Sequence, residues 1–251
     1  MKEYIFYTED QHEAYICLPD SSSKQNAAIL VLHGSGRGSE SYRNEPFYRY
    51  QRDIILKSGC IFAVVSNGLD TFGTEIGMKR IEWLYDLLLN KFHIHPTVGL
   101  FCTSAGGMMM HRYFRMHPDQ VALMISVFAI FDPETQPALE SFRKAYQASN
   151  EEELRRKIQF PSPVKQPLGF YRNIRAVILH GREDHVVPVS QSLEFCKKVL
   201  EDGGTIKCII TDGGHSTTNF ALYETDEILY ELVRFHKNIT ETECNIFQNP
   251  I

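Results

Sequence analysis

Apolar residues in this chain gather in short continuous runs, and longer amphipathic stretches separate these runs. The runs at residues 27–32, 60–66 and 176–180 have the length and continuity of strands that are buried on both faces of a sheet. Residues 47–57 are predicted to form a helix, and so are residues 75–90, because apolar positions there recur at the i, i+3, i+4, i+7 spacing. The residues of that stripe are Ile81, Leu84, Tyr85 and Leu88.

Strands and helices alternate along the rest of the chain, which indicates an α/β fold. Residues 3–7 and 12–18 predict an antiparallel hairpin at one edge of the sheet. The remaining expected elements are strands at 98–101, 123–130 and 206–210 and helices at 108–113 and 222–236. We therefore expect a single domain over residues 1–251, built on a mostly parallel eight-stranded sheet with helices on both faces. Residues 238–251 are expected to form a loosely docked tail.

The pentapeptide Cys102-Thr103-Ser104-Ala105-Gly106 lies between a predicted strand and a predicted helix, which is the context of a nucleophile elbow. Such a turn is so tight that the side chains two positions either side of the serine must be small. Gly106 meets this requirement, and Cys102 stands where the usual pattern has a glycine. Ser104 is thus the candidate nucleophile. The alternative is a small-residue loop that only links the strand to the helix.

A second glycine-rich segment, His33-Gly34-Ser35-Gly36-Arg37-Gly38, follows the apolar run at 27–32. In enzymes with a nucleophile elbow, this loop gives one backbone N–H to the oxyanion hole, and the residue after the nucleophile gives the other. Here those donors would be Ser35, or Gly36 in its place, and Ala105. The alternative is a phosphate-binding loop. It is the weaker interpretation, because neither Gly-Lys-Ser/Thr nor Gly-x-Gly-x-x-Gly occurs there.

Two further motifs follow predicted strands. Gly181-Arg182-Glu183-Asp184 comes after the run at 176–180, and Gly213-Gly214-His215 comes after 206–210. Ser104, Asp184 and His215 then follow one another in the chain order of the α/β-hydrolases. With these four motifs the chain resembles the α/β-hydrolase superfamily, among its small serine esterases and its dienelactone-hydrolase-like or prolyl-oligopeptidase-like catalytic domains. The resemblance implies an α/β-hydrolase fold.

Other residues compete for two of the catalytic roles. Asp132 is the rival acid, because some members of the superfamily place the acid after the preceding strand. Among the histidines, His180 ends a buried strand and is expected to be a structural hydrogen-bonding residue. His185 is expected on the surface, and His33 is expected to support the oxyanion loop. Cys102 is an imaginable thiol nucleophile, but an elbow presents its central residue, Ser104.

Residues 132–170 are too many for an ordinary connection between two elements. Apolar residues fall there on two predicted helical faces, with Leu139, Phe142 and Tyr146 on one and Leu154 and Ile158 on the other. We expect a small helical lid over the elbow, by analogy with loops that close active sites. The alternative is a surface embellishment.

Composition narrows the function classes. The chain has 251 residues, 43% of them hydrophobic, and a formal net charge of −5, which gives no electrostatic footprint for nucleic acid. No apolar run approaches the roughly 20 residues of a membrane helix, and the first ten residues lack an apolar signal core. The six cysteines have no paired spacing, which favours free thiols in a reducing cytoplasm. The pair His93 and His95 precedes a proline and is typical of a surface turn.

The expected activity is hydrolysis of a carboxylic ester of small to medium size through an acyl-enzyme intermediate. Ser104 would attack, His215 would take its proton, and Asp184 would orient His215. No cofactor or metal is expected, and the expected partner is a small-molecule ester rather than nucleic acid or a membrane. No pattern indicates an oligomeric state. A peptidase or amidase with the same triad, and a non-catalytic binding protein on the same fold, stay open as alternatives.

Overall fold

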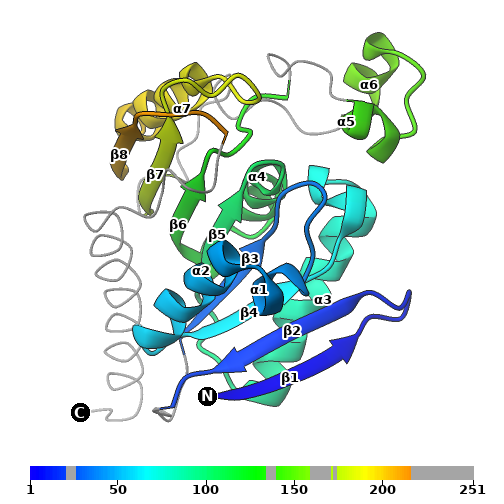
Figure 1. Cartoon of the computed structure of the whole chain (residues 1–251), viewed down its shortest axis with the longest axis vertical. Helices are drawn as coiled ribbons and strands as arrows, with labels where there is room; N and C mark the ends of the chain where they lie inside the picture. Colours follow the sequence, from blue (N-terminus) through cyan, green and yellow to red (C-terminus); the bar gives the residue numbers. More distant parts are fainter. Residues whose placement is uncertain (21–26, 134–139, 159–170, 172–173, 216–251) are drawn as a thin grey trace.

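Eight strands form one sheet in the computed structural model, which describes residues 1–20, 27–133, 140–158, 171 and 174–215. The strands are β1 (Lys2–Tyr7), β2 (Glu13–Leu18), β3 (Ala28–Leu32), β4 (Ile61–Val65), β5 (Val98–Thr103), β6 (Val121–Val127), β7 (Arg175–Gly181) and β8 (Thr205–Thr211). Their order across the sheet is β1-β2-β4-β3-β5-β6-β7-β8. Figure 1 shows the sheet running from the β1–β2 hairpin to β8.

The sheet is mostly parallel. Only β1 with β2 and β2 with β4 pair antiparallel, and every other neighbouring pair is parallel. The carboxyl ends of β3 to β8 therefore lie at one edge of the sheet, where the loops that follow these strands come together. This arrangement confirms the predicted eight-stranded sheet and its edge hairpin.

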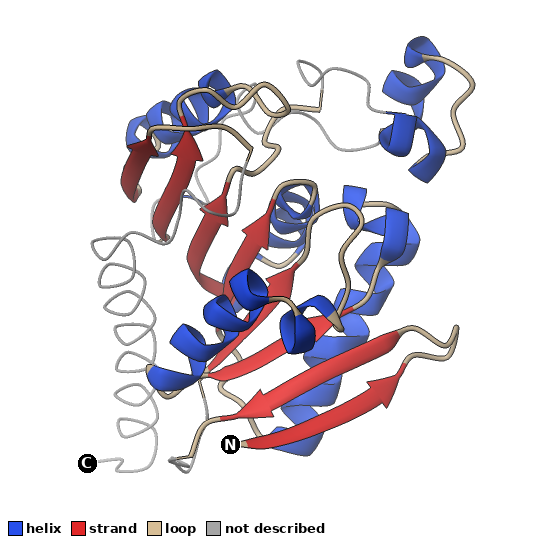
Figure 2. Ribbon diagram, viewed as in Figure 1, coloured by secondary structure: helices blue, strands red, loops and turns tan. Residues whose placement is uncertain are grey.

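Helices cover both faces of the sheet (Figure 2). They are α1 (Ser41–Asn44), α2 (Pro46–Lys57), the 3₁₀ helix η1 (Gly68–Phe72), α3 (Glu75–Phe92), α4 (Gly106–Met116), the 3₁₀ helix η2 (Pro118–Gln120), α5 (Glu140–Ala145), α6 (Glu151–Lys157) and α7 (Val189–Glu201). Residues from α3, α4 and α7 pack in one apolar cluster, and residues from α1 and α2 pack in a second.

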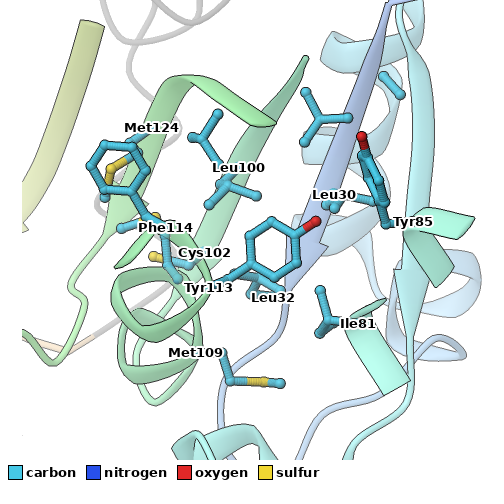
Figure 3. Packing of buried hydrophobic residues seen from close by; sticks show 14 of the residues in the cluster. Leu30, Leu32, Ile81, Tyr85, Leu100, Cys102, Met109, Tyr113, Phe114 and Met124 are labelled. Carbon is cyan, nitrogen blue, oxygen red and sulfur yellow. The ribbon is translucent and has the colours of Figure 1, made fainter. Parts of the chain in front are cut away.

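Strand β3 shows how the sequence fills both layers. Its side chains alternate between the two clusters, because successive side chains of a strand point to opposite faces. Leu30 and Leu32 belong to the cluster with α3 and α4, and Ile29 and Val31 belong to the cluster with α2. Figure 3 shows Leu30 and Leu32 in the first cluster, with Ile81 of α3 and Tyr113 of α4 close by. Because both faces of β3 are buried, its sequence has to be apolar at every position.

Strand β6 differs from its predicted range of 123–130. It begins at Val121 and ends at Val127. Phe128 then has a φ of 41°, in the left-handed region where a strand cannot continue. The apolar residues after Val127 are still buried, but they lie outside the strand, and Ile130 packs in a cluster with Ala105 of the elbow turn. The prediction was wrong at this end because residues 128–130 are buried without being part of a strand, and the apolar pattern alone does not distinguish the two cases.

The segment 132–170 contains two short helices among its described residues, α5 and α6, beyond the carboxyl ends of the parallel strands (Figure 1). The Phe142 ring of α5 stacks on Phe72 of η1 with ring centroids 5.0 Å apart. The Tyr146 hydroxyl donates to the carbonyl oxygens of Phe72 and Gly73 at 3.1 and 3.0 Å. Helix α5 and the following residue, Tyr146, thus pack against η1 and the residue after it. The predicted helix 222–236 and the tail 238–251 lie outside the described residues, as does Leu139.

Within the described part of the chain, no helix combines the length and the apolar character needed to cross a membrane.

A buried histidine of α4 makes stability depend on pH. His111 is 2% exposed, and its Nδ1 lies 2.8 Å from the Tyr171 hydroxyl. Burial, helped by the charge of Arg115, lowers the pKa of His111 to about 3. Between that value and about 6.5 the unfolded chain binds a proton that the folded protein does not, so the free energy of unfolding falls as the pH falls through this window.

We expect His111→Gln to flatten this dependence. Between pH 7 and pH 5 the free energy of unfolding should drop by roughly 2 kcal/mol less in the variant than in the wild type. Urea denaturation at both pH values measures the difference. The exposed His185 supplies the control, since His185→Gln should leave the dependence unchanged. Equal slopes in the wild type and His111→Gln would contradict the assignment.

Candidate active site

The turn between β5 and α4 holds Ser104 in a strained backbone conformation. Its φ is 49°, which residues with a side chain rarely adopt. The Ser104 N–H donates to the Val127 carbonyl at 3.1 Å, and the Ser104 carbonyl accepts from the Ile130 N–H at 2.9 Å. Both partners come from β6 and the residues directly after it. Neighbouring backbone therefore stabilises the strained turn, as strain at functional sites requires.

Glycines allow the chain to pass closely around this serine. A Cβ at Gly106 would lie 2.0 Å from the Leu32 carbonyl oxygen, so no side chain fits where α4 begins against the end of β3. A Cβ at Gly34 would lie 3.1 Å from the Ser104 Cβ. The backbone of the loop after β3 therefore runs directly beside the candidate nucleophile, which is where an oxyanion donor has to be.

Hydrogen bonds hold the loop after β3 in this place. His33 is fully buried, its Nδ1–H donates to the Gly34 carbonyl at 2.8 Å, and its Nε2 accepts from the Asn67 N–H at 2.8 Å. Burial lowers the pKa of His33 to about 4, so the ring is neutral at pH 7. The Gly34 N–H donates to the Thr103 hydroxyl at 3.0 Å, and the Thr71 hydroxyl donates to the His33 carbonyl. His33 supports the loop in the way the sequence predicted.

Three backbone N–H groups near Ser104 are candidates for the oxyanion hole. Among the described residues, no hydrogen bond uses the N–H of Ser35, Gly36 or Ala105. Ala105 is the first residue after Ser104, and Ser35 and Gly36 follow the loop position that contacts Ser104. These donors are therefore available to a ligand. Their role as an oxyanion hole stays a prediction.

The structure brings Ser104, His215 and Asp184 together from three separate loops. His215 Nε2 lies 3.1 Å from the Ser104 Oγ, and His215 Nδ1 lies 2.7 Å from Asp184 Oδ2. The His215 side chain is 19% exposed, and that of Asp184 is fully buried. Because a carboxylate only accepts, Nδ1 carries the proton and Nε2 is free to accept one from Ser104.

Asp184 is a buried carboxylate with several donors. Burial alone would raise its pKa. The N–H groups of the His180 and His215 rings outweigh burial, and the Val187 N–H adds to them, so the pKa of Asp184 lies well below its usual range. Oδ1 accepts from the N–H groups of Val186 and Val187 at 2.9 and 2.8 Å. Asp184 is therefore ionised at neutral pH.

The rival candidates occupy other positions. Both ring nitrogens of His215 are engaged, with Asp184 and with Ser104, so Asp132 is not the residue that orients it. Asp132 lies buried instead where its N–H donates to Gln191 Oε1 at 3.0 Å. His185 is exposed, as expected. Cys102 is fully buried in the sheet, and burial raises the pKa of its thiol far above the usual value.

The sequence analysis missed an aromatic contact of His215. The Phe128 ring packs against the His215 ring with centroids 4.4 Å apart and an angle of 53° between the planes. The left-handed φ of Phe128 turns the chain out of β6 at this point. A lone phenylalanine inside an apolar run carries no sequence signal for this contact.

An apolar cluster surrounds Ala105, and we call it the elbow cluster. It joins the elbow, η1, α4, α5, α6 and the loops after β6 and β7. Its buried residues are Phe72, Ala105, Met108, Ile130, Phe142, Leu154 and Val187. The candidate nucleophile thus stands beside an apolar region to which the described part of the segment 132–170 contributes two buried side chains and several partly buried ones. In the described part of the structure, no group of three or more His, Cys, Asp or Glu side chains is arranged to hold a metal ion.

Comparison with known proteins agrees with this geometry. The model of the prolyl oligopeptidase family matches residues 81–238, more than half of the chain. No curated protein sequence matches the chain. The fold and the arrangement of Ser104, Asp184 and His215 define an α/β-hydrolase. Within this class the chain belongs to the prolyl oligopeptidase family.

Solved structures support the same fold at low sequence identity. A sugar hydrolase from Lactococcus lactis matches with a TM-score of 0.69 and 15% identity, over 96% of this chain and 99% of that one. Carboxyl esterase 2 from the mycorrhizal fungus Tuber melanosporum matches with a TM-score of 0.66 and 15% identity, over 94% and 87%. A prolyl endopeptidase matches with a TM-score of 0.70 and 15% identity, over 96% of this chain but only 38% of that one. The predicted α/β-hydrolase fold is confirmed, and the protein is a hydrolase.

Proposed function

We propose that the protein is a serine hydrolase that cleaves carboxylic esters of small to medium size through an acyl-enzyme intermediate. The observation that carries the proposal is the continuous hydrogen-bonded series from the Ser104 hydroxyl through His215 to the buried Asp184 carboxylate. A serine hydroxyl becomes an effective nucleophile when a neighbouring base takes its proton and a third group orients that base.

The reaction starts when Ser104 Oγ attacks the acyl carbon while its proton passes to His215 Nε2. Backbone N–H groups of Ala105 and of Ser35, or of Gly36 in its place, donate to the oxygen on which negative charge develops. The bond to the alcohol breaks, and the alcohol leaves with the proton from His215. Water then gives a proton to His215 and attacks the acyl carbon. The bond between the acyl carbon and Ser104 Oγ breaks, Oγ takes the proton back from His215, and the carboxylic acid leaves. No step calls for a metal or a cofactor.

The apolar surroundings of the nucleophile favour an apolar acyl group. Ala105 and Met108 lie in one cluster with Phe72 and with Phe142 of the segment 132–170. Apolar side chains beside the reacting carbon stabilise a hydrocarbon acyl chain by removing it from water. Phe142 and Leu154 support the hypothesis that the segment 132–170 is a lid, because they lie in the same apolar cluster as Ala105.

A peptidase or amidase activity of the same triad is the second candidate, and the family match favours it. The two candidates use the same acyl-enzyme chemistry and differ in the leaving group. A panel of chromogenic esters with acyl chains of two to twelve carbons, run beside aminoacyl amides, separates them. Cleavage of the amides alone would replace the ester proposal by the peptidase alternative.

Ser104→Ala should keep the fold and lower kcat by a factor on the order of 10⁶, because the nucleophile is lost while binding remains. Labelling of the wild type by a fluorophosphonate should disappear in the same variant. Labelling that persists in Ser104→Ala would assign the reactive group elsewhere. A wild-type protein that neither reacts with the probe nor turns over any substrate would indicate the non-catalytic alternative.

Asp184→Asn should lower kcat by a factor on the order of 10⁴, because the amide no longer holds His215 in the tautomer that accepts the Ser104 proton. Asp132→Asn is the matched control, since the same change is made at the rival buried acid. It should cost far less activity. Steady-state kinetics of the two variants on one ester decides between the acids, and a reversed order would reassign the role to Asp132.

Phe142→Leu should widen the space beside Ala105 and favour longer acyl chains. The ratio of kcat/KM for an eight-carbon to a two-carbon acyl ester should rise by roughly tenfold, the scale on which a pocket discriminates one or two methylene groups. Phe62→Leu removes the same atoms from the cluster on the far face of the sheet and should leave the ratio unchanged. An unchanged ratio in Phe142→Leu would remove Phe142 from the acyl site.

A further inference from the structure

His180 lies beneath the candidate catalytic acid, at the end of β7. It is fully buried, and its Nε2 lies 2.9 Å from the Val187 carbonyl oxygen and 3.3 Å from Asp184 Oδ2. Its Nδ1 lies 2.7 Å from the hydroxyl of Ser192, a buried residue of α7. A second imidazole therefore contacts the same carboxylate that orients His215.

The partners of His180 define its tautomer. The Val187 carbonyl and the Asp184 carboxylate can only accept, so Nε2 must carry the proton. Nδ1 then has only a lone pair, and the Ser192 hydroxyl must donate to it. The Ser192 hydroxyl thus helps to hold the ring with Nε2 facing the acid, without touching the acid itself.

Three N–H groups donate to Asp184, and a fourth lies against it. The N–H groups of Val186 and Val187 donate to Oδ1, and His215 donates to Oδ2. The Nε2–H of His180 donates to the Val187 carbonyl and lies 3.3 Å from Oδ2. The Asp184 side chain is fully buried, so these donors take the place of water around the charge. Each added donor on Oδ2 lowers the density of negative charge that this oxygen offers to His215.

We propose that His180, oriented by Ser192, is a positioning residue that fixes the Asp184 carboxylate and weakens its stabilisation of the His215 imidazolium. His215 then remains a neutral base at lower pH than it would with an acid that received fewer hydrogen bonds. This inference rests on the proposed function, because the pH range of a base matters only if His215 acts as one.

The groups that face His180 come from three directions. Asp184 and Val187 approach from the loop after β7, and His215 lies beyond Asp184. Cys208 of β8 is near enough to interact electrostatically with His180, and Cys208 interacts in turn with Cys196 of α7. Among the described residues, Asp184 is the group that is charged at neutral pH and in contact with the ring.

The test compares the pH dependence of kcat/KM in His180→Leu, Ser192→Ala and the wild type. Loss of the N–H donor in His180→Leu concentrates charge on Oδ2, so the acidic limb should move to higher pH by about 0.5 to 1 unit, a fraction of the worth of one hydrogen bond to a charged group. Ser192→Ala should move the limb in the same direction by less, because His180 remains but its ring loses the hydrogen bond from Ser192 that helps to orient it.

Conservative variants provide the rescue. In His180→Gln the side-chain amide can still donate toward Asp184, and in Ser192→Thr the hydroxyl is kept. The acidic limb of kcat/KM in each of these two variants should therefore lie close to that of the wild type. His185→Gln changes an exposed histidine of the same loop and should have no effect. A purely structural role would lower the number of active sites, counted by fluorophosphonate titration, at every pH and would leave the limb where it is.

A readout without turnover separates failure of this inference from failure of the proposed function. NMR of the His215 ring reports its protonation and its Nδ1 proton bonded to Asp184, even in a protein that hydrolyses nothing. An upward shift of that titration in Ser192→Ala supports the inference, and so does the same shift in His180→Leu. Should His180→Leu fail to fold, Ser192→Ala decides. An unmoved titration and an unmoved limb in the folded variants overturn it.

Discussion

The tight passage of the chain at Ser104 is the constraint on which the rest of the site depends. Ser104 has a left-handed φ, and α4 starts so close to the end of β3 that a Cβ at Gly106 would lie 2.0 Å from the Leu32 carbonyl oxygen. Hydrogen bonds from the end of β6 hold the turn. Because three neighbouring parallel strands meet at this point, their loops can bring the candidate nucleophile, the candidate oxyanion donors and Phe128 to one place.

The second requirement is the stabilisation of a buried charge at the end of β7. A carboxylate without water around it is costly unless donors surround it, and Asp184 has three hydrogen-bond donors and a fourth N–H group beside it. Two of the donors come from its own loop and one from His215, and the fourth N–H group belongs to His180. The arrangement keeps the acid ionised while it orients His215. It also links the end of β7 to α7 through Ser192, so packing of that helix bears on the proposed chemistry.

The family match includes only part of the candidate site. The family match spans residues 81–238, which include the elbow, Asp184 and His215, whereas the loop at 33–38 lies before it. The case for that loop therefore rests on geometry alone, through the contact of Gly34 with Ser104 and the bonds of His33. The chain spans only 38% of the prolyl endopeptidase it resembles, so the substrate of that enzyme has no direct bearing here.

The sequence by itself determined that helices cover both faces of the sheet. It also determined the choice of Ser104, Asp184 and His215 as candidate catalytic residues. Uninterrupted apolar runs have no stable place except between two layers, and glycines beside a serine between strand and helix are needed only for a tight turn. Only the tertiary structure decided where β6 ends, that Phe128 packs on His215, and that His180 contacts the acid. The Phe128 contact joins residues that are distant in the chain, and the His180 contact depends on the turn that the chain makes after β7, so no local pattern predicts either of them. The end of β6 depends on a backbone turn, and the apolar pattern of the sequence is the same whether a buried residue continues a strand or leaves it.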